Sequence, residues 1–125
     1  MSRILVVDDD PAILKMVELT LINAGHEVVT SDTPMGVSAL VRRFKPHVLI
    51  LDVMMPGLSG ESLAKLIVRI AERRPVIFFS ASTNQDLLDL TRRVPDSTFV
   101  QKGESLKELV ATVEKMSRLY ASQAP

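Results

Sequence analysis

Three consecutive aspartates follow the first apolar run of the chain, in the stretch ILVVDDDP. Two carboxylates about 4 Å apart repel each other by roughly 4 kcal/mol at an effective dielectric of about 20, so this cluster disfavours folding unless something offsets its charge. Oxygen ligands without a thiolate or an imidazole suit a hard divalent cation such as Mg²⁺. Asp10 precedes Pro11 and is expected to cap a helix, which leaves Asp8 and Asp9 as the candidate metal ligands.

Other side chains with suitable chemistry end three further apolar runs. Asp52 stands in LILDVMMPG, Ser80 in VIFFSAS and Lys102 in FVQKGE. An aspartate can attack phosphorus as a nucleophile and form an aspartyl phosphate. The oxygens of the transferred group then need cations and hydrogen-bond donors around them, which Mg²⁺, the Lys102 ammonium and the Ser80 hydroxyl would supply. These residue types favour metal-assisted acceptance of a phosphoryl group.

The elements that must position these residues are five short strands. Three of the runs are continuously apolar, not alternating, which is typical of parallel strands buried on both faces. The expected strands are Arg3–Asp8, Glu27–Ser31, Val48–Asp52, Val76–Ser80 and Thr98–Gln101.

Helix signals lie between the strands, and most consist of a capping residue followed by proline or by an apolar pattern. The first helix ends at Gly25, the third ends near Arg74, and the fourth spans about 84–93. The expected starts are Asp10-Pro11, Thr33-Pro34, Ser59 or Gly60, Asn84, and the capping box Ser105-x-x-Glu108.

The order is a strand and a helix repeated five times. Such α/β chains form a doubly wound, five-stranded parallel sheet, (βα)5, with helices on both faces. Sites in open sheets of this kind form outside the carboxyl ends of the strands, where the strand order reverses. We therefore expect the chemically capable residues to meet at one edge of the sheet. They are Asp8, Asp9, Asp52, Ser80 and Lys102.

Composition narrows the class of protein. The 125 residues are the size of one domain, 46% are hydrophobic, the formal net charge is zero and cysteine is absent. Neutrality gives no electrostatic case for binding nucleic acid or a membrane surface, and the lack of cysteine excludes disulfides and thiolate sites. No run of about 18 apolar residues and no signal pattern occurs. We expect a cytoplasmic domain at 1–120, with 121–125 as a tail or the start of a linker.

Taken together, the motifs resemble the receiver domain of two-component response regulators over nearly the whole chain. The resemblance is to single-domain chemotaxis-type regulators and implies a flavodoxin-like strand order, 2-1-3-4-5. The family pattern is an acidic pair after the first strand, a phospho-accepting aspartate in a D-x-x-M-P-G-like stretch, a Ser or Thr after the fourth strand and a Lys after the fifth. Here these are Asp8-Asp9, Asp52 in DVMMPG, Ser80 and Lys102.

The resemblance implies a role for each matching residue. Asp52 would accept the phosphoryl group from a histidine kinase or a phosphotransfer protein. Asp9, Asp52 and the backbone carbonyl of Met54 would bind Mg²⁺ directly, and Asp8 would bind it through a water molecule. The chain would be a signalling phosphoprotein, not a turnover enzyme, although it would assist its own phosphorylation and dephosphorylation.

Further residues match the switching part of the family. Ser80 and Lys102 would contact the phosphoryl group, and Ser80 would move toward it after transfer. Phe99 matches an aromatic that changes rotamer, and Ala81 matches the small residue after the hydroxyl. The surface of the fourth helix, the fifth strand and the fifth helix would then contact an output protein. The chain would be a monomer or a phosphorylation-dependent dimer and would not bind nucleic acid through this domain.

Departures from the family keep alternatives open. Gly103 stands where a proline usually follows the lysine, and Phe99 stands where many members carry tyrosine. Both favour a pseudo-receiver, a constitutive interaction module without phosphorylation, whereas the intact acidic residues argue against it. A phosphohydrolase would carry a second acid at position 54, where this chain has methionine. Flavin binding is disfavoured because the first loop is acidic and offers no phosphate cradle.

Overall fold

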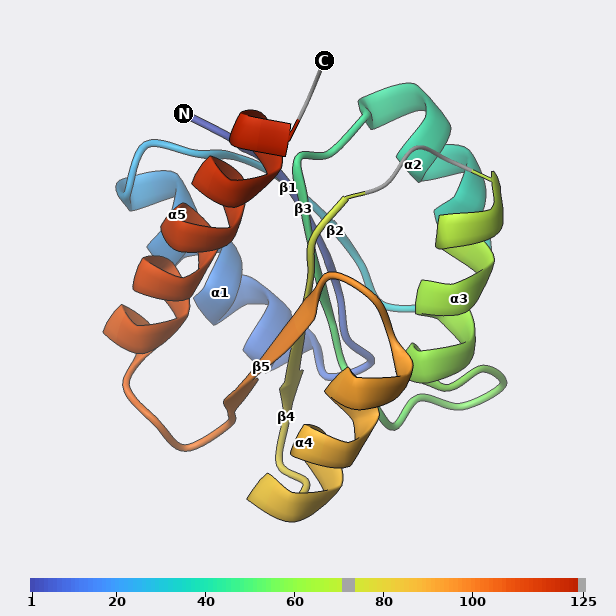
Figure 1. Cartoon of the computed structure of the whole chain (residues 1–125). Coiled ribbons are helices and arrows are strands. Elements are labelled where there is room, and N and C mark those ends of the chain that lie inside the picture. The colour runs from blue at the N-terminus through green and yellow to red at the C-terminus, as the bar shows by residue number, and fades with distance from the viewer. Residues whose placement is uncertain (71–73, 124–125) are drawn as a thin grey trace.

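Five parallel strands form one sheet in the order β2-β1-β3-β4-β5, which confirms the predicted fold class (Figure 1). The computed structural model describes residues 1–70 and 74–123. The strands are β1 (Arg3–Val7), β2 (Glu27–Ser31), β3 (Val48–Leu51), β4 (Val76–Ser80) and β5 (Ser97–Gln101).

Helices cover both faces of the sheet: α1 and α5 pack on one face, and α2, α3 and α4 on the other (Figure 1). They are α1 (Pro11–Asn23), α2 (Val37–Phe44), α3 (Gly60–Ile70), α4 (Asn84–Arg93) and α5 (Leu106–Gln123). No helix among residues 1–70 and 74–123 has the length and apolar character needed to cross a bilayer.

The core is two-sided because successive strand residues point to opposite faces. Leu5 and Val7 of β1 pack under α2, α3 and α4, whereas Ile4 and Val6 pack under α1 and α5. All four are at most 1% exposed. Burial on both faces explains the continuously apolar strand sequences, and it fixes the position of the polar residues that follow each strand.

Local capping agrees with the sequence at most helix starts. Asp10 accepts hydrogen bonds from the N–H groups of Ala12 and Ile13 and so caps α1, as expected. Ser59 Oγ accepts from Ser62 N at the start of α3.

β1 and β3 each end one residue before the predicted aspartate, so Asp8 and Asp52 lie just beyond the strands.

The predicted start of the second helix is wrong. Thr33 Oγ1 accepts a hydrogen bond from Met35 N, and the residues form a turn that precedes the helix. Gly36 has a φ of 79°, a left-handed conformation that interrupts helical geometry, so α2 begins only at Val37. The third helix is predicted to end near Arg74, whereas α3 is described as far as Ile70 and Arg74 itself is not helical; residues 71–73 lie outside the described residues.

Candidate functional site

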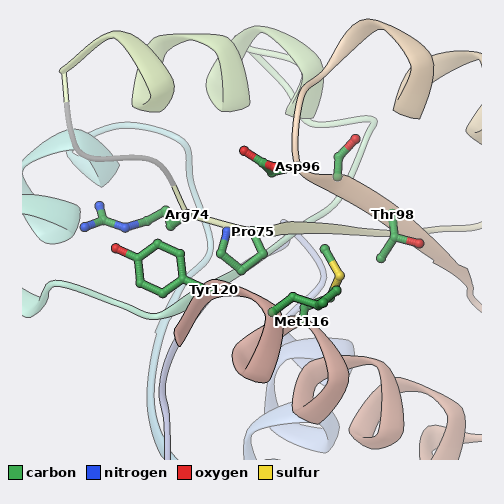
Figure 2. A pocket seen from close by; sticks show the side chains of 8 residues that line it. Arg74, Pro75, Asp96, Thr98, Met116 and Tyr120 are labelled. Atoms are coloured by element: carbon green, nitrogen blue, oxygen red, sulfur yellow. The ribbon is translucent and has the colours of Figure 1, made fainter. Parts of the chain in front are cut away.

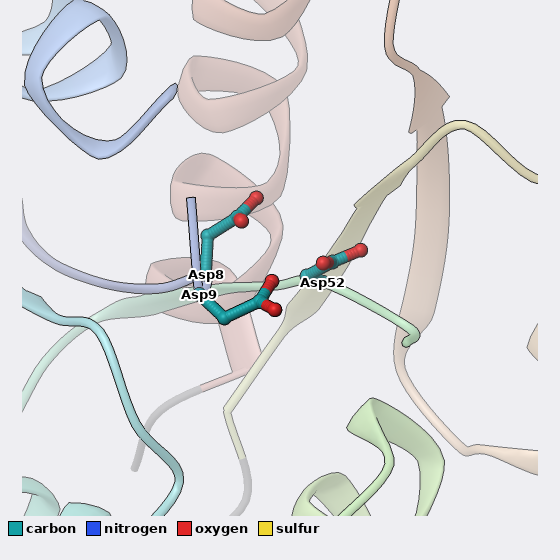
Figure 3. A group of neighbouring side chains, drawn as sticks. All are labelled: Asp8, Asp9 and Asp52. Carbon is teal, nitrogen blue, oxygen red and sulfur yellow. The ribbon is translucent and has the colours of Figure 1, made fainter. Parts of the chain in front are cut away.

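The carboxyl ends of β1 and β3 bring three aspartates together. The two strands are neighbours, with Val7 opposite Leu51, and Asp52 N donates a hydrogen bond to Val7 O at 2.9 Å. One carboxylate oxygen from each of Asp8, Asp9 and Asp52 lies within 4.8 Å of the other two. Figure 3 shows the three side chains gathered at these adjoining strand ends.

Lys102 lies against the buried part of this cluster. Its Nζ is 2.7 Å from Asp8 Oδ2 and 3.6 Å from Asp52 Oδ2, and it lies 5.9 Å from the centre of the Phe79 ring. Asp8 is 2% exposed and Asp52 is 7% exposed, whereas Asp9 faces solvent. The site therefore has an open acidic side at Asp9 and an enclosed side that holds the ammonium group.

The ammonium offsets only part of the carboxylate charge. Burial raises the pKa of Asp52 above its ordinary value, and the neighbouring Asp8 carboxylate raises it further. Lys102 and the backbone N–H groups of Met54 and Val53 act in the opposite direction, but the net shift of the pKa is still upward. The cluster thus retains unbalanced negative charge.

Its donor set fits a hard divalent cation. All three side chains offer carboxylate oxygens, which are the ligands that Mg²⁺ prefers, at the carboxyl ends of two adjoining strands, and Asp9 is open to solvent. The three carboxylates have the single ammonium of Lys102 beside them, so a cation would offset their remaining mutual repulsion. Asp8, Asp9 and Asp52 are therefore the residues that could hold a metal ion.

Ser80 lies at the end of β4, between the acidic cluster and the edge strand. It is 2% exposed, and its backbone carbonyl accepts a hydrogen bond from Lys102 N at 2.8 Å. Its hydroxyl lies 3.2 Å from Ser82 Oγ and also accepts from Ser82 N at 3.3 Å. The sheet fixes the backbone of Ser80, so any local movement of this residue is a rotation of its side chain, which these bonds to Ser82 oppose.

The remaining predicted residues lie around this centre. Met54 is 71% exposed, Ala81 is exposed, and Phe99 is partly buried against the core on the α4 side of the sheet. The Lys102–Gly103 peptide is trans, as are all the peptide bonds of the described residues. Gly103 has a φ of 101°, which a residue with a side chain rarely adopts, so glycine suits this loop.

Two supporting contacts did not follow from the sequence. Gly60 packs so closely on the backbone of Asp52 and Val53 that a Cβ atom would overlap the Asp52 carbonyl oxygen. Gln101 Nε2 donates to Ser82 O at 2.8 Å. Period-two alternation does place Gln101 on the same face of β5 as Phe99, but it does not indicate the acceptor.

A separate pocket of about 250 Å³ lies at the opposite ends of the strands (Figure 2). None of the site residues predicted from the sequence contributes to it, so the candidate site remains at the carboxyl ends. The residues that line this separate pocket are Arg74, Pro75, Asp96, Ser97, Thr98, Met116, Leu119 and Tyr120.

The chain matches the family described as response regulator receiver domain over residues 4–114. It is 32% identical over 118 residues to the DNA-binding response regulator MtrA of Mycolicibacterium smegmatis, covering 94% of this chain and 51% of the relative. It is 31% identical over 119 residues to the phosphate regulon transcriptional regulatory protein PhoB of Pseudomonas aeruginosa, covering 94% and 52%. The chain thus spans about half the length of these curated relatives.

Solved structures agree with the fold. The chemotaxis protein CheY4 of Vibrio cholerae superposes with a TM-score of 0.84 at 25% identity, covering 93% of this chain and 98% of that one. NtrX from Brucella abortus superposes with a TM-score of 0.89 at 26% identity, covering 98% of this chain and 28% of that one.

Proposed function

Because the chain belongs to the response regulator receiver domain family, we propose that Asp52 accepts a phosphoryl group from a histidine kinase or a phosphotransfer protein in the cytoplasm. The observation that carries this proposal is the convergence of Asp8, Asp9, Asp52 and Lys102 at adjoining strand ends. Acceptance of the phosphoryl group would act as a signalling switch and not as a turnover reaction.

Asp9, Asp52 and the backbone carbonyl of Met54 would hold Mg²⁺, with Asp8 contributing through a water molecule. When bound, the ion supplies positive charge that offsets the carboxylates and the phosphoryl oxygens. The fit rests on the oxygen-only donor set and on the closeness of the three carboxylates, each with one oxygen within 4.8 Å of the other two.

In the transfer, a carboxylate oxygen of Asp52 attacks phosphorus and forms the O–P bond. The P–N bond of a phosphohistidine donor breaks, and its electron pair stays on the imidazole nitrogen. The Lys102 ammonium contacts the phosphoryl oxygens, and it need move only locally because it already lies 3.6 Å from the Asp52 carboxylate. The Ser80 hydroxyl donates to another phosphoryl oxygen.

The added group brings about −1.5 to −2 charge and strong acceptor oxygens to the strand edge. Ser80 turns toward these oxygens, Ala81 leaves room beside it, and Phe99 repacks. The surface formed by α4, β5 and α5 then presents a different shape to an output protein or to a second copy of the chain. A local charge change thus biases a two-state element.

Phosphorylation by a small donor tests the proposal. The protein is incubated with acetyl phosphate and Mg²⁺, and its intact mass is measured. Wild type should gain one phosphoryl group, and Asp52→Asn should gain none. Asp32→Asn is a matched control because Asp32 is an exposed aspartate that follows β2 at the same edge of the sheet, and it should be modified like wild type.

Two outcomes would contradict the proposal. A wild-type chain whose mass does not change, although its fold is intact, would favour a pseudo-receiver that acts without phosphorylation. Multiple turnovers on small phosphate esters would instead indicate a phosphohydrolase, which the apolar side chain of Met54 argues against.

A further inference from the structure

Ser82, in the loop between β4 and α4, is held from two directions. On one side its N–H and its hydroxyl both bond to Ser80 Oγ, at 3.3 Å and 3.2 Å. On the other side its carbonyl accepts a 2.8 Å hydrogen bond from the side-chain amide of Gln101. The loop is thus fixed between the ends of two neighbouring strands.

The Ser80 side chain is now oriented toward Ser82, and turning toward a phosphoryl group on Asp52 would disturb these bonds. A serine hydroxyl has one proton to donate and two lone pairs that accept. If Ser80 donates its proton to a phosphoryl oxygen, the bond to Ser82 Oγ persists only with Ser82 as its donor. Rotation of Ser80 would also take its oxygen away from Ser82 N, so Ser82 must find other partners or move.

Gln101 resists that movement. It is partly buried on β5, directly before Lys102, and its backbone carbonyl accepts from Glu104 N at 3.2 Å. β5 pairs with β4 up to Ser80 and Gln101, which lie opposite each other, so the two residues that hold Ser82 belong to the same part of the sheet. A donor anchored in this way keeps Ser82 within reach of Ser80.

We propose that Gln101 is a positioning residue that holds Ser82, and through it Ser80, in the arrangement of the unphosphorylated chain. This role rests on the proposed function. Breaking the bond between Gln101 and Ser82 would free the loop and favour the arrangement in which Ser80 faces Asp52.

Beryllofluoride, a phosphoryl mimic that needs no donor, provides the test. Gln101→Met keeps the length of the side chain but removes the donor. In saturating Mg²⁺, this variant should bind beryllofluoride about 3- to 10-fold more tightly than wild type, the population change that one net hydrogen bond produces. Its affinity for Mg²⁺ alone should be unchanged, because the carboxylates are untouched.

Two further variants separate positioning from a loss of structure. Ser82→Ala removes the hydroxyl bond to Ser80 and should also tighten binding, and the double variant should gain less than the sum of the two, because both changes release the same loop. Gln85→Met is the matched control. Gln85 Nε2 donates to Asp89 Oδ1 at 2.9 Å on the exposed face of α4, and the loss of that bond should leave both affinities as in wild type.

The outcomes distinguish this inference from the function on which it rests. If wild type accepts phosphoryl and beryllofluoride but Gln101→Met binds the mimic no more tightly, the positioning role is refuted and the switch stands. If wild type takes neither group, the proposed function itself fails. Should Gln101→Met not fold, Gln101→Glu serves, because an ionised carboxylate cannot donate to the Ser82 carbonyl and should give the same tighter binding.

Discussion

Replacing Gly60 by alanine tests whether the start of α3 fixes the backbone of the proposed phospho-acceptor. Gly60 N donates to Val53 O at 2.9 Å, which brings the two segments into direct contact. A Cβ on Gly60 would overlap the Asp52 carbonyl oxygen and would lie 3.0 Å from Asp52 C and 3.1 Å from Val53 Cα. All three are backbone atoms, so no flexible side chain can move aside.

The expected effect is on both stability and function. Overpacking of this kind costs about 1–3 kcal/mol, and we expect about 2 kcal/mol in the free energy of unfolding from urea titrations. A shift of about 1 Å at a reacting group can lower a rate by about 10²-fold. Phosphorylation by acetyl phosphate, followed by intact mass against time, should therefore be about 10- to 100-fold slower than in wild type.

Gly25→Ala is the matched control. Gly25 has a φ of 94°, but a Cβ there would meet no heavy atom within 4 Å, and the residue lies beyond the C-terminal end of α1, away from the site. Left-handed strain should cost about 1–2 kcal/mol and leave the rate of phosphorylation unchanged. A normal rate in Gly60→Ala, or an equal loss of rate in Gly25→Ala, would refute the reasoning.

Three further predictions concern charge. Burial is the main cause that lowers the pKa of His26 and His47 below 6.5, so as the pH falls the unfolded chain binds protons before the folded chain does, and the free energy of unfolding should decrease below about pH 6.5. Replacing both histidines by asparagine should flatten this pH dependence in urea titrations. An unchanged slope in the double variant would contradict the prediction. Arg93→Gln should raise the pKa of Glu61 from about 2 toward 4.5 in carboxyl NMR titrations, because Arg93 donates two 3.1 Å hydrogen bonds to it; a pKa still near 2 would refute that cause. Mg²⁺ at about 100 times its dissociation constant should add about 2.7 kcal/mol to the free energy of unfolding of the wild-type chain. Asp9→Asn should remove most of this gain at the same Mg²⁺ concentration. An equal gain in the variant would exclude Asp9 as a ligand.

Much of the fold followed from local signals. Continuously apolar strands indicated burial on both faces, and Asp10 before Pro11 marked the start of α1. The same kind of signal failed at Thr33-Pro34, because a hydroxyl followed by proline also suits a turn, and Gly36 then adopts a left-handed backbone. A dipeptide alone does not distinguish the two outcomes.

The location of the site could be predicted from the sequence, but the contacts within it could not. Strand ends predicted which edge carries Asp52 and Lys102, because all parallel strands end on the same side. The 2.7 Å contact between Lys102 and Asp8 depends instead on how far a long side chain reaches across two intervening strands. The bond between Gln101 and Ser82 depends on loop geometry, which has no periodic signal.

The strand order places the two halves of the site on strands that differ in their stability against local opening. β1 and β3, which precede the three aspartates, each have a neighbour on both sides, whereas β5, which precedes Lys102, is an edge strand with β4 as its one neighbour. Segments with fewer partners open locally at lower free energy, so backbone amides of β5 should exchange with deuterium sooner than those of β1 and β3. Local opening of β5 would move the Lys102 ammonium group away from the site, while Asp8, Asp9 and Asp52 stay together.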